Sequence, residues 1–317
     1  MESEKEFKRV GTHHGRFHAD DVMATAILKE IFDIELTRTR DKDILKDLDI
    51  VYDVGGGEFD HHGVDKVYRE DGTPYAACGL IWKAFGKRII QFKDNTLNEE
   101  ETEDIYGYMD RVLIEGIDAL DNGVRIESGE IPLMHISSII SGFNPPWFSD
   151  KSQDESFNEA IEVASSVFDN TFNRRLSVIK AKGNIIKAFE KRDNPKILIL
   201  DTFSPWGEVL KEVDENDEVV FVIYPKDDNY AIQTIRGRDG SDKKKLPAFW
   251  GGKENEELAE ITGVEDAVFC HTGRFIAVAG SMDGILNMAE LAINEPEERE
   301  RKEKGIFNFI KRLFNRK

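Results

Sequence analysis

One long helical pattern over residues 152–192 divides this sequence into two parts and limits the folds open to it. Its apolar positions recur at helical spacing, at Phe157, Ile161, Ala164, Phe168, Phe172 and Ile179. Ser152-Gln-Asp-Glu155 fits a capping box, which satisfies free backbone N–H groups at a helix start, and Asp193-Asn194-Pro195 ends the pattern. A helix this long without a globular interruption often joins two lobes, so we expect the domain boundary to lie on it.

Residues 1–125 alternate short β-like runs with helical patterns. The β-like runs cover residues 7–10, 35–39 and 50–54, and the helical patterns cover residues 20–31, 76–85 and 99–120. Strands that alternate with helices indicate βαβ units and a mostly parallel sheet. We therefore expect residues 1–151 to form an α/β domain.

The residues after the long helix follow a different pattern, in which β-rich runs are more frequent. β-rich runs cover residues 197–200, 219–224 and 231–235, and Asp227-Asp-Asn229 between the last two predicts a hairpin. Residues 268–271 and 275–278 predict a second hairpin that turns at Thr272-Gly273, and residues 281–293 predict a helix. The expected fold class is α/β, with a connecting helix over residues 152–194 and a smaller C-terminal α/β domain over residues 195–294.

Residues 295–317 form a separate tail. Its first part, residues 295–304, is a charge run of the kind found on solvated surfaces or in disordered segments. In residues 305–317, three apolar residues share one helical face beside four basic ones: Phe307, Ile310 and Phe314, with Lys311, Arg312, Arg316 and Lys317. Such a helix can bind a membrane surface or a groove on a protein partner. The alternative, which we favour, is that it packs on its own domain.

The charge balance limits what the chain can bind. Its 317 residues carry 43 Lys and Arg against 62 Asp and Glu, a net charge of −19. Proteins that hold nucleic acid by bulk electrostatics neutralise phosphates with Lys and Arg, so the acid excess argues against that mode of binding. Apolar residues make up 40%, which suffices for sizeable cores, and no apolar run approaches the roughly 18 residues of a membrane span.

The cysteine count and the N-terminus bear on the compartment. Cys78 and Cys270 are the two cysteines, far apart in sequence, and a reduced cytosolic protein is the simplest interpretation. The N-terminal residues are charged and lack the apolar core of a signal peptide. We expect a cytoplasmic protein if the source is a prokaryote, and a eukaryotic address stays open.

Histidines and aspartates concentrate in two short clusters, each placed where a predicted strand ends. The first cluster contains His13, His14, His18, Asp20 and Asp21, and the second contains Asp53, Asp60, His61 and His62. In open α/β sheets, ligands bind at this edge. A lone histidine is more often a surface or hydrogen-bonded core residue, but that interpretation does not explain five of the seven histidines lying here beside turn-forming glycines.

The composition of the two clusters favours a metal site. A set of carboxylates and imidazoles without thiolates is typical of a site for manganese, iron or zinc, and is less typical of a structural zinc site. Together with further acids they offer about six ligands, enough for two metals that act in phosphoryl transfer. The Gly55-Gly-Gly57 run does not indicate a dinucleotide site, because it lacks the G-x-G-x-x-G layout and the helix that should follow.

A third acidic element, Asp118-Ala-Leu-Asp121-Asn-Gly123, ends a predicted helix. Asp118 and Asp121 are three residues apart and share a helical face. The alternative to a functional role is an exposed helix end closed by Asn122-Gly123. Local sequence does not separate the two interpretations.

These motifs resemble those of the melanocyte-proliferating-gene family, also labelled metal-dependent protein hydrolases, within the DHH phosphoesterase superfamily. The resemblance lies in Gly11-Thr-His-x-Gly-x-Phe-His-x-Asp20 and in Val54-Gly-Gly with Phe59-Asp-His-His62. It extends to residues 118–123, to Leu246-Pro-x-x-Trp250 and to Phe269-x-His271-x-x-x-Phe275-Ile, and so covers residues 8–293. It implies a DHH-type catalytic domain, a DHHA-like substrate-binding domain and a cleft that holds two divalent metals, with manganese favoured.

The resemblance also implies a metal-ligand set. Its members are His13 or His14, then His18, Asp20, Asp53 and His61, and finally Asp118 or Asp121. His18 stands where the superfamily usually has Asp. Strict spacing points to His14, whereas the family phrase Thr-His-x-Gly points to His13, which we favour while keeping both.

Further roles follow from the same resemblance. Asp60 would orient His61, and His62 would contact the substrate phosphate or act as an acid. In the C-terminal domain, His271 and Arg274 are candidates to bind phosphate, with Arg236 and the lysines of residues 243–245 as looser candidates. The glycine-rich stretch usual after this histidine is thinner here, where the chain has Ala277-Val-Ala-Gly280.

The expected function is therefore a metal-dependent phosphodiesterase acting on nucleic acid, as a 3′-to-5′ exonuclease that prefers RNA. Its partner would be single-stranded RNA or a short oligonucleotide, gripped over a short length because of the acid excess, and a homodimer stays open. One alternative is a small-molecule phosphohydrolase acting on short oligonucleotides, cyclic dinucleotides or pyrophosphate. A second alternative is a non-catalytic metal-containing binding protein, against which the complete ligand set argues.

Overall fold

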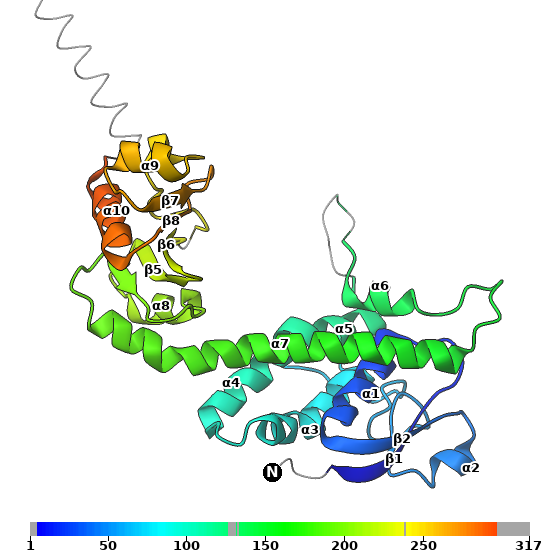
Figure 1. Cartoon of the computed structure of the whole chain (residues 1–317). Coiled ribbons are helices and arrows are strands. Elements are labelled where there is room, and N and C mark those ends of the chain that lie inside the picture. The colour runs from blue at the N-terminus through cyan, green and yellow to red at the C-terminus, as the bar shows by residue number, and fades with distance from the viewer. Residues whose placement is uncertain (1–4, 126–130, 132, 238, 297–317) are drawn as a thin grey trace, which may run out of the picture. The chain divides into compact units, whose positions relative to one another are not determined.

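The computed structural model describes residues 5–125, 131, 133–237 and 239–296. The chain forms two compact units, Met1–Leu176 and Ser177–Lys317. The long helix α7 (Gln153–Glu190) runs across the boundary between these units (Figure 1). The helix predicted over residues 152–192 is thus confirmed, and the hydroxyl of Ser152 accepts a hydrogen bond from the Asp154 N–H at its start.

A parallel three-stranded sheet lies in the first unit. Strands β1 (Glu6–Thr12), β2 (Phe32–Arg38) and β3 (Ile50–Val51) lie in the order β2-β1-β3. Helix α1 (Ala19–Ile31) connects β1 to β2, and the short helix α2 (Lys42–Leu45) precedes β3. This arrangement confirms the predicted βαβ unit and parallel pairing.

Helices enclose the sheet and α1. They are α3 (Ala77–Lys93), α4 (Glu99–Met109), α5 (Glu115–Asp121) and α6 (Ile136–Ser141). The pattern at residues 99–120 predicted one helix, but a π-helical turn, η1 (Asp110–Ile114), separates α4 from α5. A π-turn keeps the apolar spacing nearly helical, so periodicity alone does not reveal it.

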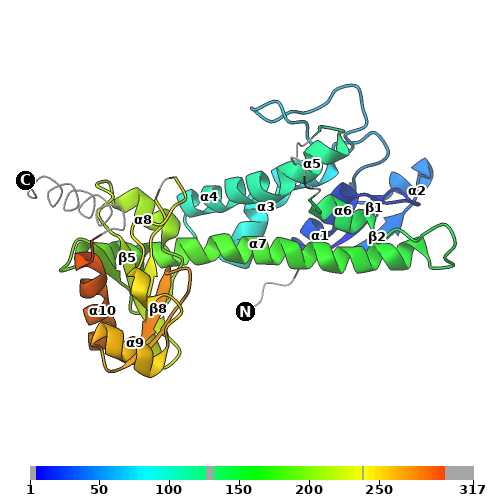
Figure 2. The same ribbon diagram turned by 90° about the horizontal axis from the view of Figure 1, so that it is seen from above.

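The first half of α7 belongs to the core of this unit. Phe157 packs edge-to-face on Phe17 at a ring-centroid distance of 5.3 Å, and Phe168 packs on Trp82 at 5.7 Å. Figure 2 shows α1 and α3 beside this half of α7. Residues Val22–Leu28 of α1 are all buried, so α1 lies in the core of this unit.

The second unit is built on a five-stranded mixed sheet. Its strands are β4 (Ile197–Ile199), β5 (Phe221–Lys226), β6 (Asn229–Thr234), β7 (Ala267–Cys270) and β8 (Ile276–Ala279). They lie in the order β4-β5-β6-β8-β7, with β4 parallel to β5 and the other pairs antiparallel. Both predicted hairpins, β5–β6 and β7–β8, are confirmed.

Helices cover both faces of this sheet. Ile223 and Ile232 point to one face, where they share a core with Trp250 of η2 (Ala248–Trp250) and with α9 (Asn255–Thr262) and α10 (Met282–Asn294). Val222 and Ala231 point to the other face, packed with α8 (Gly207–Val213) and the second half of α7. The alternation follows from the two-residue repeat of a strand.

The fold is therefore α/β, with a parallel sheet and a long helix as expected. The DHH-type and DHHA-like assignments and the boundaries 1–151, 152–194 and 195–294 stay predictions. Residues 297–317, which hold most of the predicted tail, lie outside the described residues. Within the described part of the chain, no helix is long and apolar enough to cross a membrane.

Candidate metal centre

Two neighbouring parallel strands bring the two histidine and aspartate clusters together. Gly11 of β1 pairs with Val51 of β3, so the loops that leave these strands start side by side at the carboxyl edge of the sheet. The first loop leads into α1, and the second turns back on itself before residue 63. This edge is where open α/β sheets place their ligands.

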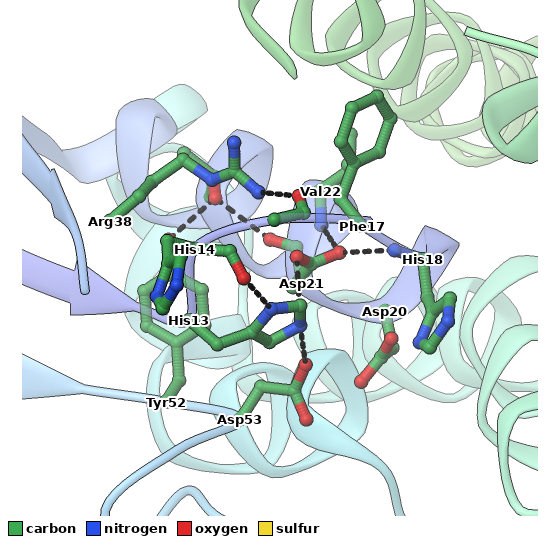
Figure 3. Close-up of polar contacts among 12 residues, drawn as sticks. His13, His14, Phe17, His18, Asp20, Asp21, Val22, Arg38, Tyr52 and Asp53 are labelled. Atoms are coloured by element: carbon green, nitrogen blue, oxygen red, sulfur yellow. Dashed lines mark hydrogen bonds and ion pairs between the residues drawn. The ribbon is translucent and has the colours of Figure 1, made fainter. Parts of the chain in front are cut away.

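The first loop contributes His13. Its side chain is buried, and its Nε2 lies 3.1 Å from Asp53 Oδ2 and 3.4 Å from Asp21 Oδ2 (Figure 3). Its Nδ1 lies 3.2 Å from the carbonyl oxygen of His14, whose own side chain is exposed. Of the two histidines kept open by the sequence, the structure brings His13 into the cluster and leaves His14 outside it.

Asp20 and Asp21 occupy the first turn of α1, and both are fully buried. Asp21 Oδ1 accepts hydrogen bonds from the N–H groups of His18 and Val22, each at 2.9 Å. Both oxygens of Asp20 and Oδ2 of Asp21 accept no hydrogen bond from the described residues. A helix N-terminus favours carboxylates, but these three oxygens are left without a hydrogen bond, and two of them face imidazoles, Asp21 Oδ2 at 3.4 Å from His13 and Asp20 Oδ2 at 3.9 Å from His61.

The second loop is shaped by left-handed residues. Asp53 has φ 57°, and Gly55 and Gly56 have φ 89° and 74°. The chain then turns back, and the N–H of Gly56 donates to Asp60 Oδ2 at 2.7 Å. The left-handed conformation at a non-glycine residue costs roughly 1–2 kcal/mol, and here it aims the Asp53 carboxylate at His13.

His61 and His62 lie beside Asp53 and differ in their partners. His61 is buried, with Nδ1 3.5 Å from Asp53 Oδ1 and Nε2 2.9 Å from Asp121 Oδ2. His62 is exposed, stacks on His61 at 4.3 Å, and has its Nδ1 2.8 Å from Asp60 Oδ1. Asp60 therefore holds His62, whereas the resemblance implied that it orients His61.

Asp118 and Asp121 have different surroundings. Asp121 Oδ1 lies 3.6 Å from Nδ1 of the exposed His18, so the Asp121 carboxylate pairs with both His18 and His61. Asp118 is fully buried one turn earlier, where it accepts hydrogen bonds from Arg69 at 2.7 Å and from the Gly79 N–H at 3.0 Å. The structure thus brings Asp121 into the cluster and places Asp118 in a separate ion pair.

Burial and crowded charge shift the protonation of the cluster. Burial, with the nearby carboxylates of Asp53 and Asp121, raises the pKa of Asp20 well above its usual range. Burial raises the pKa of Asp21 to about 7, although His13 opposes this. Burial alone would lower the pKa of His13 and His61, but their aspartate neighbours raise both pKa values overall. In the metal-free chain all four shifts favour the protonated forms of these groups.

The donor set fits divalent cations. Three groups have ligand atoms that all lie within 4.8 Å of one another: Asp53 with His61 and His62, His13 with Asp21 and Asp53, and His18 with Asp20 and Asp121. Asp53 belongs to two of these groups. A divalent cation would offset the charge of the buried carboxylate oxygens that accept no hydrogen bond, and oxygen–imidazole sets suit manganese, iron or zinc. These residues could therefore bind metal.

The implied ligand set omitted Asp21, although the first cluster contained it. Its position beside Asp20 at the start of α1 was the available signal. The family motif ends at Asp20 and so named only that aspartate, and adjacent residues on a helix point about 100° apart. Both aspartates reach the site because it wraps around the first turn of α1, with His13 on one side and Asp121 near the other.

Comparison with known proteins identifies the family. The family model MYG1_exonuc, described as an uncharacterised protein family (UPF0160), matches residues 9–293. The chain belongs to the MYG1 family. It is 30% identical over 318 residues to the MYG1 protein C694.04c of Schizosaccharomyces pombe, covering 91% of this chain and 98% of that protein. It is 28% identical to the MYG1 exonuclease of Rattus norvegicus and 27% to that of Homo sapiens, covering 90% of this chain and 84% and 85% of theirs.

The MYG1 family match extends into the second unit, which holds the three predicted substrate contacts. His271 and Arg274 flank the β7–β8 turn, where the N–H of Gly273 donates to His271 Nδ1 at 2.9 Å. Arg274 has a left-handed backbone, φ 62°. Arg236 follows β6 and is exposed. As substrate contacts these residues stay predictions.

Proposed function

We propose that this chain is a metal-dependent phosphodiesterase of the DHH superfamily that hydrolyses single-stranded RNA from the 3′ end at a two-metal site. The observation that carries the proposal is the buried cluster in which four aspartates meet two buried histidines, with several oxygens unsatisfied: Asp20, Asp21, Asp53 and Asp121, with His13 and His61. Such a cluster is costly to fold without a cation.

The proposed roles follow from position. His13, Asp21 and Asp53 would hold one metal, and Asp53 with His61 and His62, or Asp20 with His18 and Asp121, would hold a second, with manganese favoured. Bound divalent cations supply an activated water and stabilise the oxygens of the transferred phosphoryl group. Asp60 fixes His62 at the exposed rim, where its imidazole can contact a phosphate oxygen or donate a proton.

The nuclease part of the proposal rests on the family. The rat and human relatives are named MYG1 exonuclease, and the chain matches them over most of their length. The 3′-to-5′ direction of hydrolysis and the preference for RNA rest on the sequence resemblance. The net charge of −19 favours a grip on a strand end over a long grip, because the 62 acids outnumber the 43 Lys and Arg that could neutralise phosphates.

A substrate panel tests the proposal. Purified protein with Mn²⁺ would receive 5′-labelled single-stranded RNA, single-stranded DNA, dinucleotides and pyrophosphate. We expect RNA to be shortened from the 3′ end, and the activity to be lost in Asp53→Asn but kept in Asp33→Asn, which removes the charge of an exposed aspartate on β2.

Other outcomes would replace the proposal. Turnover of dinucleotides or pyrophosphate alone would establish a small-molecule phosphohydrolase. An absence of turnover on every substrate, with metal bound, would establish a binding protein.

A further inference from the structure

A cavity of about 550 Å³ opens in the second unit, beside α8 and the ends of β6 and β8. Its wall includes Phe203, Trp206, Gln233, Arg236 and Phe275. All of its lining residues belong to this unit, so the cavity is defined without reference to the metal centre. Its volume falls in the range of small-molecule sites, roughly 300–1,000 Å³.

Aromatic rings form one wall of the cavity. Phe203 and Trp206 pack edge-to-face at 5.7 Å, and Tyr224 supports Trp206 from behind at 5.4 Å. Phe203 is 61% exposed and Phe275 is 39% exposed, so both keep ring surface open to a ligand. Exposed aromatic rings that are packed from one side favour stacking of a flat heteroaromatic ring such as a nucleobase.

The lining carries four acids, Glu208, Asp214, Asp217 and Asp242, against three cations, Lys211, Arg236 and Lys243, so it is the guanidinium of Arg236 and not the net charge that favours a phosphate. The acids Asp217 and Asp214 pair with Lys243, and Asp242 accepts a hydrogen bond from the Thr234 hydroxyl at 3.0 Å. Among the described residues, by contrast, no side chain pairs with Arg236. A guanidinium that lines a cavity without a carboxylate partner is suited to bind phosphate.

Gln233 adds a directed donor. Its Oε1 accepts a hydrogen bond from the Tyr224 hydroxyl at 2.9 Å, and this contact fixes the orientation of the amide. The amide nitrogen is then left to donate to an acceptor in the cavity that Gln233 lines. Ring acceptors of a nucleobase offer such a partner.

We propose that this cavity binds one nucleotide unit, with the base stacked on the wall of Phe203 and Trp206 and the phosphate on Arg236. The inference rests on the proposed function and deepens it, because the substrate of a nuclease is a chain of nucleotides, one of which would occupy this cavity. The family resemblance pointed to Arg236 as a phosphate contact, but not to the aromatic wall or to Gln233.

The test is calorimetric binding of adenosine monophosphate to the full chain in EDTA, which removes any contribution from the metal centre. Arg236→Gln and Trp206→Leu should each weaken binding about tenfold, through the lost charged hydrogen bond and the lost stacking. Lys226→Gln is the matched control, since it removes an exposed cation of the same unit outside the cavity, and it should bind normally.

Partial ligands separate the two halves of the site. Adenosine and ribose 5-phosphate should each bind at least about tenfold more weakly than adenosine monophosphate. The inference fails if the nucleotide does not bind, if Arg236→Gln and a correctly folded Phe203→Leu both bind it normally, or if ribose 5-phosphate binds as tightly as the nucleotide. RNA hydrolysis without nucleotide binding would overturn this inference alone, whereas nucleotide binding without RNA hydrolysis would overturn the proposed function alone.

Discussion

At the scale of single residues, neighbours in sequence take different positions. His13 is buried in the cluster while His14 is exposed, and Asp121 faces His61 while Asp118 faces Arg69. The sequence identified both pairs, favoured His13 over His14 while keeping both, and left the choice between Asp118 and Asp121 open. A choice between adjacent residues depends on the backbone dihedrals of a loop, and a choice within one helical face depends on which neighbours pack there.

Replacing His13 and His14 separately tests the first of these choices. His13→Ala removes an imidazole that lies 3.1 Å from Asp53, so Mn²⁺ affinity should fall at least about tenfold. His14→Ala removes an exposed ring, and affinity should stay unchanged. Isothermal titration with Mn²⁺ measures both. A larger loss in His14→Ala would reverse the assignment.

The raised pKa of Asp21 predicts a pH effect on the metal-free protein. Burial holds this pKa at about 7 in the folded chain against 3.8 for the free group, so the folded state binds more protons between these values. Asp21 therefore lowers stability as the pH rises through this window. Asp21→Asn keeps an oxygen for the N–H groups of His18 and Val22 and removes the charge.

In EDTA, Asp21→Asn should melt at a higher temperature than the parent chain at pH 8, and by a smaller margin at pH 5. Thermal unfolding followed by circular dichroism measures the margin. Saturating Mn²⁺ should reverse the order, because the cation then stabilises the aspartate. A margin that does not grow with pH would contradict the pKa direction.

At the scale of elements, the site depends on how α5 is fixed. Arg69 donates to Asp110 of η1 and to Asp118 of α5, and Asp118 also accepts from the start of α3. This ion-pair network places Asp121 one turn later, next to His61. The Arg69 side chain is 7% exposed, so the ion pairs are largely shielded from water.

Arg69→Met should destabilise the chain by about 3 kcal/mol, because it leaves Asp118 buried without its partner. Arg111→Met is the control: the Arg111 side chain in its ion pair with Glu115 is 72% exposed, and the loss should stay below about 1 kcal/mol. Urea unfolding measures both. The double variant Arg69→Met, Asp118→Asn should recover part of the loss, and an undiminished loss would show that Arg69 acts through other contacts.

Elements were predictable where the sequence pattern is long or repeated. The helix α7 and the hairpins β5–β6 and β7–β8 follow from helical spacing and turn residues. The π-turn η1 was missed because it preserves apolar spacing, and the partner of Asp60 was missed because it depends on how the loop after β3 turns back. The cavity of the second unit assembles residues 178–275, which no local pattern connects.

At the scale of the whole molecule, some of the excess acidic residues lie at the candidate metal centre and the others lie elsewhere in the chain. Six aspartates gather at or near the candidate centre, where Arg69 pairs with Asp118 and bound cations would offset the charge of the others: Asp20, Asp21, Asp53, Asp60, Asp118 and Asp121. The remaining excess still opposes a long grip on polynucleotide, and a strand end or a short oligonucleotide suits the chain better.

The central claim is that the buried aspartates and histidines form a centre for two divalent cations. Counting bound Mn²⁺ per chain by equilibrium dialysis tests it most directly. We predict two ions per chain for the parent protein and for Asp33→Asn, and fewer than two for Asp53→Asn, since Asp53 belongs to two of the ligand groups. Absence of bound Mn²⁺ in the parent protein, or equal binding in Asp53→Asn, would contradict the claim.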